Sequence, residues 1–93
     1  MAALEAPERK AVQAPAQSAG WMVTVFDNEV NTYEEVMTVL ILGTCCSQEE
    51  AYIEAWEIDH FGQCVVHRST EDECRGAAGV IATIGIKVEV GPE

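Results

Sequence analysis

The pattern of hydrophobic and polar positions changes at residue 20. Residues 1–20 are rich in Ala, Gln, Pro and Ser and show no sustained periodicity, which is typical of a flexible segment. Beyond this point apolar residues recur at every second position or at helical spacing, as they do in strands and helices. We therefore predict a flexible N-terminal extension over residues 1–20 and one folded domain over residues 21–93.

Three segments have the pattern of β-strands. Residues 21–26 are β-branched and aromatic, and polar turn-forming residues follow them. Residues 63–67 form a short second strand, in which Cys64 is expected to face the core and His67 the solvent, because neighbouring positions alternate sides. Residues 84–90 alternate apolar with small or charged side chains, which predicts a third, half-buried strand.

Three further segments have the apolar spacing of helices, and each begins with Ser or Thr three positions before a Glu. This capping-box pattern predicts helices over about residues 32–43, about 47–60 and from Thr70 onward. Gly76 and Gly79 weaken the third helix, so we expect them to allow close packing against a neighbour. The acids of the second helix are expected to form a solvated face: Glu49, Glu50, Glu54 and Glu57.

The order of these elements predicts the fold class. Three strands make a small sheet, and one or two helices between successive strands are enough to cover one of its faces. The domain is therefore expected to be α/β (α+β), a small two-layer sandwich of a three-stranded sheet packed with three helices. Its predicted order is β-α-α-β-α-β.

Length and charge restrict the expected partners. The 93 residues suffice for one domain, and 16 acidic against 5 basic residues give a net charge of −11. This field repels phosphate backbones and anionic lipids, so we expect no nucleic acid and no membrane partner. No apolar run approaches the roughly 20 residues of a spanning helix, and no secretory signal is visible, which favours a cytoplasmic protein.

Candidate catalytic chemistry is limited to four cysteines and two histidines. Cys45 and Cys46 are expected as small apolar residues near a helix end, and a reducing compartment keeps the cysteines as thiols. Cys64 and His67 have metal-ligating side chains, but zinc sites usually have paired ligands on both sides. No motif that activates a nucleophile surrounds these residues. We expect neither cofactor nor metal, and a thiol or metal enzyme is the least favoured hypothesis.

A polar run at the end of the first strand is more informative. Asp27-Asn28-Glu29-Val30-Asn31 precedes the first helix, and Asp59 and His60 end the second helix before Gly62. If the two helices pack side by side, these groups converge on one mouth. The alternative is that Asp27 and Asn28 only form a turn and that Asp59 is a solvated helix-end residue.

These residues resemble the ClpS family of Clp protease adaptors, which deliver N-degron substrates to an AAA+ unfoldase. The resemblance covers residues 21–90. It includes the opening strand with its signature at Asp27-Asn28-Glu29, the start of a helix at Tyr33-Glu34-Glu35-Val36, and the helix end Ile58-Asp59-His60-Phe61-Gly62, which is similar to Val-His-x-x-Gly. The spacing from the signature to the glycine matches without a gap.

The resemblance implies a non-enzymatic adaptor with two kinds of partner. One is a ClpA- or ClpC-like unfoldase, and the other is a substrate protein with a bulky hydrophobic N-terminal residue. The positions implied for binding the substrate α-ammonium are Asp27, Asn28 and Asp59. The implied hydrophobic pocket consists of Asn31, Tyr33, Val36, Ala55, Ile58 and Ile86. The implied unfoldase-docking position is Asp72.

The chain departs from the family pattern at these same positions. Asp27 and Asn28 exchange the family's Asn and Asp, and Asp59 replaces its histidine. Tyr33 and Ala55 stand where the family has methionines that gate and line the pocket. The second hypothesis is therefore a ClpS-like interaction domain that has lost or altered N-degron recognition.

Overall fold

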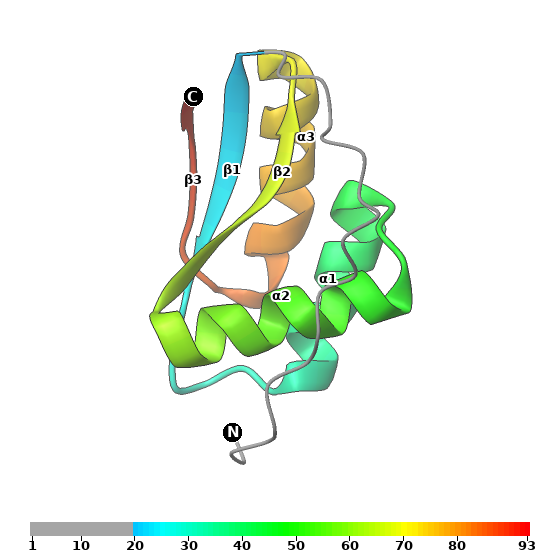
Figure 1. Cartoon of the computed structure of the whole chain (residues 1–93), viewed down its shortest axis with the longest axis vertical. Coiled ribbons are helices and arrows are strands. Elements are labelled where there is room, and N and C mark those ends of the chain that lie inside the picture. Colours follow the sequence, from blue (N-terminus) through cyan, green and yellow to red (C-terminus); the bar gives the residue numbers. More distant parts are fainter. Residues whose placement is uncertain (1–19) are drawn as a thin grey trace.

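Figure 1 shows the chain as a computed structural model, which describes residues 20–93. The elements are, in order, β1 (Trp21–Phe26), α1 (Tyr33–Thr44), α2 (Gln48–Phe61), β2 (Gln63–Ser69), α3 (Glu71–Ile81), the 3-10 turn η1 (Ala82–Ile84) and β3 (Val88–Pro92). The predicted order β-α-α-β-α-β is confirmed. The predicted flexible extension lies, apart from Gly20, outside the described residues.

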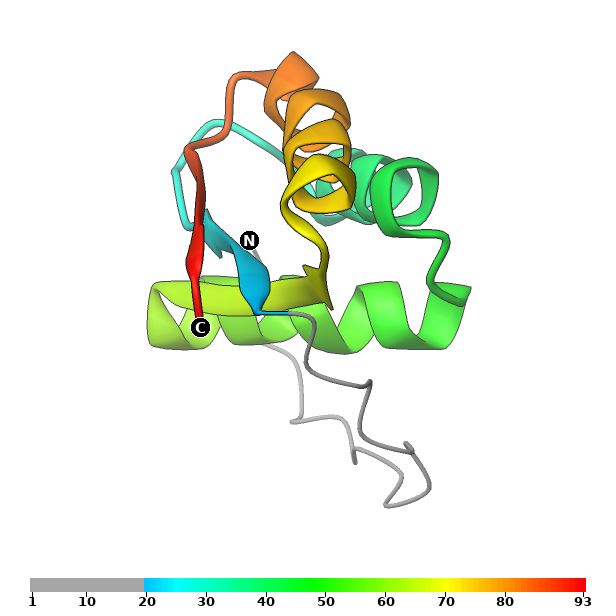
Figure 2. The ribbon, with the colours of Figure 1, turned by 90° about the horizontal axis from the view of Figure 1, so that it is seen from above.

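The three strands form one antiparallel sheet in the order β2-β1-β3. Figure 2 shows α1 and α3 next to each other on one side of this sheet, with α3 in contact with β1 and β3. In Figure 1, α2 lies across the lower end of the sheet, where it contacts β2 and α1. The core fills the space between these elements. Its largest fully buried side chains are Leu40, Ile58, Ile81, Val23, Val25 and Cys74.

The pairing of β1 with β2 contains a bulge. Val23 pairs with His67 and Val25 pairs with Cys64, so three residue steps on β2 face two on β1. The extra residue places His67 on the same side of the sheet as Cys64, and both are half-buried. The prediction that His67 faces solvent on the opposite side is wrong, because strict alternation does not hold across a bulge.

The predicted helix starts are confirmed. The hydroxyl of Thr32 accepts a hydrogen bond from the Glu35 nitrogen at 3.2 Å, and the Glu35 carboxylate accepts one from the Thr32 nitrogen at 3.0 Å. Ser47 and Thr70 accept hydrogen bonds in the same way from nitrogens three residues on. These caps satisfy main-chain donors that a helix leaves without internal partners, so they fix where α1, α2 and α3 begin.

The close approach between helices occurs at a different glycine from those predicted. A Cβ atom added to Gly43 of α1 would lie 3.0 Å from the Ala77 carbonyl oxygen and 3.2 Å from Cγ1 of Ile81. Added at Gly76 or Gly79, it would meet nothing within 4 Å. The expectation of close packing at Gly76 and Gly79 is wrong, because both glycines lie away from the buried side of α3. Helix α1 approaches that buried side at Gly43.

The third strand is shorter than predicted. Ile84 belongs to η1, and Gly85 follows it in the left-handed conformation with φ of +83°, which ends that turn. Strand pairing begins only at Val88. Ile86 is nevertheless buried in the core. The apolar alternation over residues 84–90 therefore reflects contact with the core along an irregular segment as well as along a strand.

One of the predicted solvated acids of α2 is buried. Glu54 is only 5% exposed. It lies three residues after Ala51 and four before Ile58, both of which are buried, and these spacings place it on the inner face of the helix. Its charge lies close enough to Cys46 to contribute, after burial itself, to a raised pKa of that thiol.

The adjacent cysteines lie at the end of α1, as expected. Cys45 is the exposed C-cap in the left-handed conformation, with φ of +59°, and Cys46 is half-buried. None of the four cysteines, all of which are among residues 20–93, forms a disulfide.

Candidate functional site

Asp27 follows β1 and Asp59 lies near the end of α2, and these two elements meet at the lower end of the sheet in Figure 1. The Asp27 nitrogen donates to the carbonyl oxygen of Gly62 at 2.9 Å, which ties the end of β1 to the end of α2. Burial raises the pKa of Asp27, and the charge of Asp59 raises it further. These two acids, near the ends of β1 and α2, are hereafter called the Asp27–Asp59 mouth.

Asn28 lies beside this mouth, but its side chain holds the loop together. Its Nδ2 donates to Oδ1 of Asn31 at 2.7 Å, and its Oδ1 accepts from the nitrogens of Asn31 at 3.0 Å and Val30 at 3.3 Å. Both ends of the amide are therefore used within the loop. This is the turn-forming role that the sequence also allowed.

Asn31, a predicted pocket residue, connects this loop to the rest of the domain. Its Nδ2 donates to the carbonyl oxygen of Ile84 in η1 at 3.1 Å and to Oε1 of Glu35 at 3.3 Å. The loop between β1 and α1 is thereby joined to η1, which is distant in sequence. These bonds fix the wall of the mouth against the segment that carries Ile86.

Tyr33, the first residue of α1, contacts two residues of α2. Its hydroxyl donates to Oδ2 of Asp59 at 3.2 Å, and its ring centroid lies 5.9 Å from that of Tyr52. Burial, and then the hydrogen bond to Asp59, raise the pKa of Tyr33 to about 12. Tyr33, the predicted gate residue, is thus hydrogen-bonded to Asp59, a predicted ammonium-binding residue.

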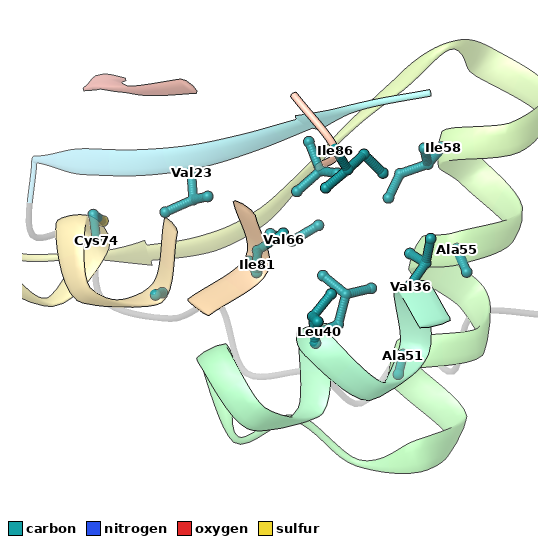
Figure 3. Close-up of a cluster of buried hydrophobic side chains, with 13 residues drawn as sticks. Val23, Val36, Leu40, Ala51, Ala55, Ile58, Val66, Cys74, Ile81 and Ile86 are labelled. Atoms are coloured by element: carbon teal, nitrogen blue, oxygen red, sulfur yellow. The ribbon is translucent and has the colours of Figure 1, made fainter. Parts of the chain in front are cut away.

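Four of the predicted pocket residues lie in the core. Figure 3 shows Val36, Ala55, Ile58 and Ile86 at the end of the core formed by α1 and α2. Each is at most 4% exposed, and Tyr33 packs against the cluster that they belong to. These four positions therefore form a closed hydrophobic floor, against which Tyr33 packs.

An aromatic cluster beside Asp59 was not predicted from the sequence. The His60 ring stacks on Trp56 with centroids 3.9 Å apart, and Phe61 meets Trp56 edge-on at 5.6 Å while remaining 68% exposed. Nδ1 of His60 lies 3.6 Å from Oδ2 of Asp59. The spacing of four between Trp56 and His60 is the signal that predicts such stacking on a helix.

Asp72, the predicted docking residue, lies far from the mouth. It is exposed in the first turn of α3, together with Glu71 and Glu73. In Figure 1 this turn is at the upper end of the sheet, whereas α2, which contains Asp59, is at the lower end.

Residues 20–93 contain neither a metal-ligating cluster nor a helix that could span a membrane. No group of three or more His, Cys, Asp and Glu side chains in this part of the chain is placed to hold a metal ion. No helix in the same residues is both long and apolar enough to cross a bilayer.

Comparisons with known proteins agree with this architecture. Residues 16–85 match the family profile described as ATP-dependent Clp protease adaptor protein ClpS. The solved structure of Agrobacterium tumefaciens ClpS2 bound to L-phenylalaninamide is similar in fold, with a TM-score of 0.74 and 18% identity, over 83% of this chain and 100% of that one. A comparison with curated protein sequences found no significant match.

The fold and the family profile define the class, which is that of small two-layer α+β adaptor domains. The chain belongs to the ClpS family of adaptors of the ATP-dependent Clp protease.

Proposed function

We propose that this chain binds free N-termini that begin with a bulky hydrophobic residue and delivers such proteins to the AAA+ unfoldase of a Clp protease. Membership of the ClpS family supports the adaptor role. The observation that carries the proposal is the Asp27–Asp59 mouth beside the apolar floor of Val36, Ala55 and Ile58. A pair of acids next to apolar side chains suits a ligand that is both cationic and hydrophobic.

The charges at the mouth favour a cation specifically. Partial burial, and then the charge of Asp59, disfavour ionisation of Asp27 and raise its pKa. An α-ammonium at the two carboxylates would offset this effect and has three donors for their oxygens. L-phenylalaninamide, the ligand of the similar ClpS2 structure, combines an α-amino group with an aromatic side chain. An acetylated terminus has no charge to offer.

A peptide titration tests the proposal. Fluorescence anisotropy would compare peptides that begin with Leu, Phe, Tyr or Trp with their N-acetylated twins, and only the free amines should bind. Asp27→Asn should weaken binding by about fivefold or more, as expected when a charge-assisted hydrogen bond is lost. Glu29→Gln, which removes an exposed acid from the same loop, is the matched control. Equal binding of free and acetylated peptides would exclude the proposed ammonium site.

The position of Asp72 suits delivery to the unfoldase. Because the first turn of α3 and helix α2 lie at opposite ends of the sheet in Figure 1, an unfoldase docked at Asp72 would leave the mouth accessible to the substrate. We therefore assign docking to the exposed first turn of α3, and a ClpA- or ClpC-like partner in the cytoplasm fits this arrangement.

A second candidate is a ClpS-like interaction domain with altered recognition. Asn28 favours it, because the amide that the family resemblance assigns to the ammonium is used within the loop. If a correctly folded protein binds none of the free-amine peptides but still binds the unfoldase, this candidate replaces the first.

A further inference from the structure

The side chain of Tyr33 lies across the part of α2 that the proposed site uses. Its hydroxyl bonds to Asp59 and its ring contacts Tyr52, and these two residues are seven positions apart, which places them on the same face of the helix. Ala55 lies between them on the inner side and is fully buried. The Tyr33 ring therefore covers the helix surface beside Ala55.

Each of these contacts is one that a bound N-terminus requires. The hydroxyl of Tyr33 donates to the Asp59 carboxylate, as an α-ammonium would. The ring packs against the floor that a large first side chain would use, where Ala55 and Ile58 are at most 1% exposed. Tyr33 and the first residue of a substrate thus compete for the same two groups.

We propose, on the basis of the proposed function, that Tyr33 is an internal stopper: its side chain fills the recognition site of the free protein and leaves when a substrate enters. The start of α1 permits this movement. As the first residue of the helix, Tyr33 has no preceding helical turn to restrict its χ1 rotamers, and it is only half-buried.

The stopper defines the class of substrate. A ligand binds only if its own contacts replace the apolar contact and the hydrogen bond that Tyr33 loses when it leaves the site. A first residue such as Phe, Tyr, Trp or Leu buries enough apolar surface to do so, whereas Ala, Ser or Gly does not. The apparent affinity for every ligand is also reduced by the fraction of molecules in which the stopper is closed.

Calorimetric titration with L-phenylalaninamide and L-alaninamide tests the stopper. Tyr33→Ala should bind L-phenylalaninamide at least about fivefold more tightly than the unaltered chain. The ratio of its affinities for L-phenylalaninamide and L-alaninamide should be smaller than that of the unaltered chain. Tyr33→Phe keeps the ring and loses only the hydrogen bond, so its gain should be smaller, roughly two- to tenfold. Tyr52→Phe, which keeps the neighbouring ring, should change nothing. Unchanged or weaker binding by Tyr33→Ala would overturn the inference.

A second measurement on the free protein separates this inference from the proposed function. A soluble paramagnetic agent broadens exposed methyl signals, and the Ala55 methyl should be protected in the unaltered chain and in Tyr33→Phe but exposed in Tyr33→Ala. Protection of that methyl in a folded Tyr33→Ala variant would overturn the stopper. If no variant binds either amide, the proposed function fails, and an exposed methyl would still support Tyr33 as the cover of this surface.

Discussion

The nitrogen of Asp27 donates to the carbonyl oxygen of Gly62 at 2.9 Å. Gly62 ends α2 in the left-handed conformation with φ of +87°, which an L side chain rarely adopts. This bond holds the end of β1 against the end of α2, so the placement of Asp27 beside Asp59 depends on main-chain geometry. Asp27 is thereby held where the charge of Asp59 contributes to its raised pKa.

The raised pKa of Asp27, caused by partial burial and then by the charge of Asp59, predicts that this residue lowers stability while it contributes to binding. Because its pKa is raised above 3.8, the folded state favours the protonated acid, and the free energy of unfolding should fall as the pH rises through that raised pKa. Asp27→Asn should therefore raise the melting temperature at neutral pH and have no effect well below pH 3.8. Since the residue is exposed, we expect a gain of less than about 1 kcal/mol. Thermal melts across this range would check the sign, and a loss of stability at neutral pH would contradict it.

The contact between α1 and α3 predicts opposite effects at two glycines. Gly43→Ala should lower the free energy of unfolding by about 1–3 kcal/mol, because the new methyl would press on Ala77 and Ile81. Gly76→Ala is the matched control, since it adds a methyl to open space inside a helix and should raise stability by roughly 0.5–1 kcal/mol. Urea denaturation of both variants measures the difference. Equal effects would show that the helices do not meet through Gly43.

The patterns that predicted the fold correctly are local. The Thr32 and Glu35 pair, for example, fixes a helix start through bonds within four residues of chain. The expectations for His67, Gly76 and Gly79 were wrong because they concerned contacts between distant segments. The bulge opposite Val23 and the tight approach at Gly43 depend on how β2 and α3 are placed by the rest of the molecule. Neither the bulge nor the close approach at Gly43 produces a periodic pattern of apolar residues in a single sequence.

The same distinction applies to the site. The spacing of polar residues and the helix ends suggested that Asp27 and Asp59 converge, and the charge of Asp59 contributes to the raised pKa of Asp27. The bond between Tyr33 and Asp59 joins residues 26 positions apart and depends on how α1 crosses α2. Periodicity places each residue on its helix but does not give the distance between the two side chains.

The exposed acid at the opposite end of the sheet allows the two proposed partners to be separated. Asp72→Lys should abolish binding to a ClpA- or ClpC-like unfoldase by reversing a charge in the first turn of α3, and it should leave peptide affinity unchanged. Glu29→Lys makes the same charge change beside the mouth and should not affect unfoldase binding. Surface plasmon resonance with each partner would measure both. Loss of peptide binding in a folded Asp72→Lys variant would argue against separate surfaces.

The hydroxyl of Tyr33 predicts a loss of stability in alkaline solution. Its pKa of about 12 exceeds the ordinary value of 10, so the folded state favours the neutral phenol. The free energy of unfolding should therefore fall between pH 10 and about pH 12, and Tyr33→Phe should remove this part of the fall. Tyr52→Phe is the control. Tyrosinate absorbance would follow the titration, and Asp59→Asn should return the pKa of Tyr33 toward 10 because it removes the negative charge beside the phenol.

The relationship between Tyr33 and Ala55 predicts energetic coupling. Ala55→Met places a long side chain where Ala55 is fully buried, so it should cost about 1–3 kcal/mol by overpacking. If the Tyr33 ring covers this position, Tyr33→Ala provides the missing space, and the same change should then cost at least about 1 kcal/mol less, within the usual range for residues in contact. Ala51→Met is the matched control, because Ala51 is equally buried one turn earlier in α2 and should show additive effects with Tyr33→Ala. Urea denaturation of the four chains of each cycle gives the coupling. Additivity at Ala55 would mean that Tyr33 does not cover this surface.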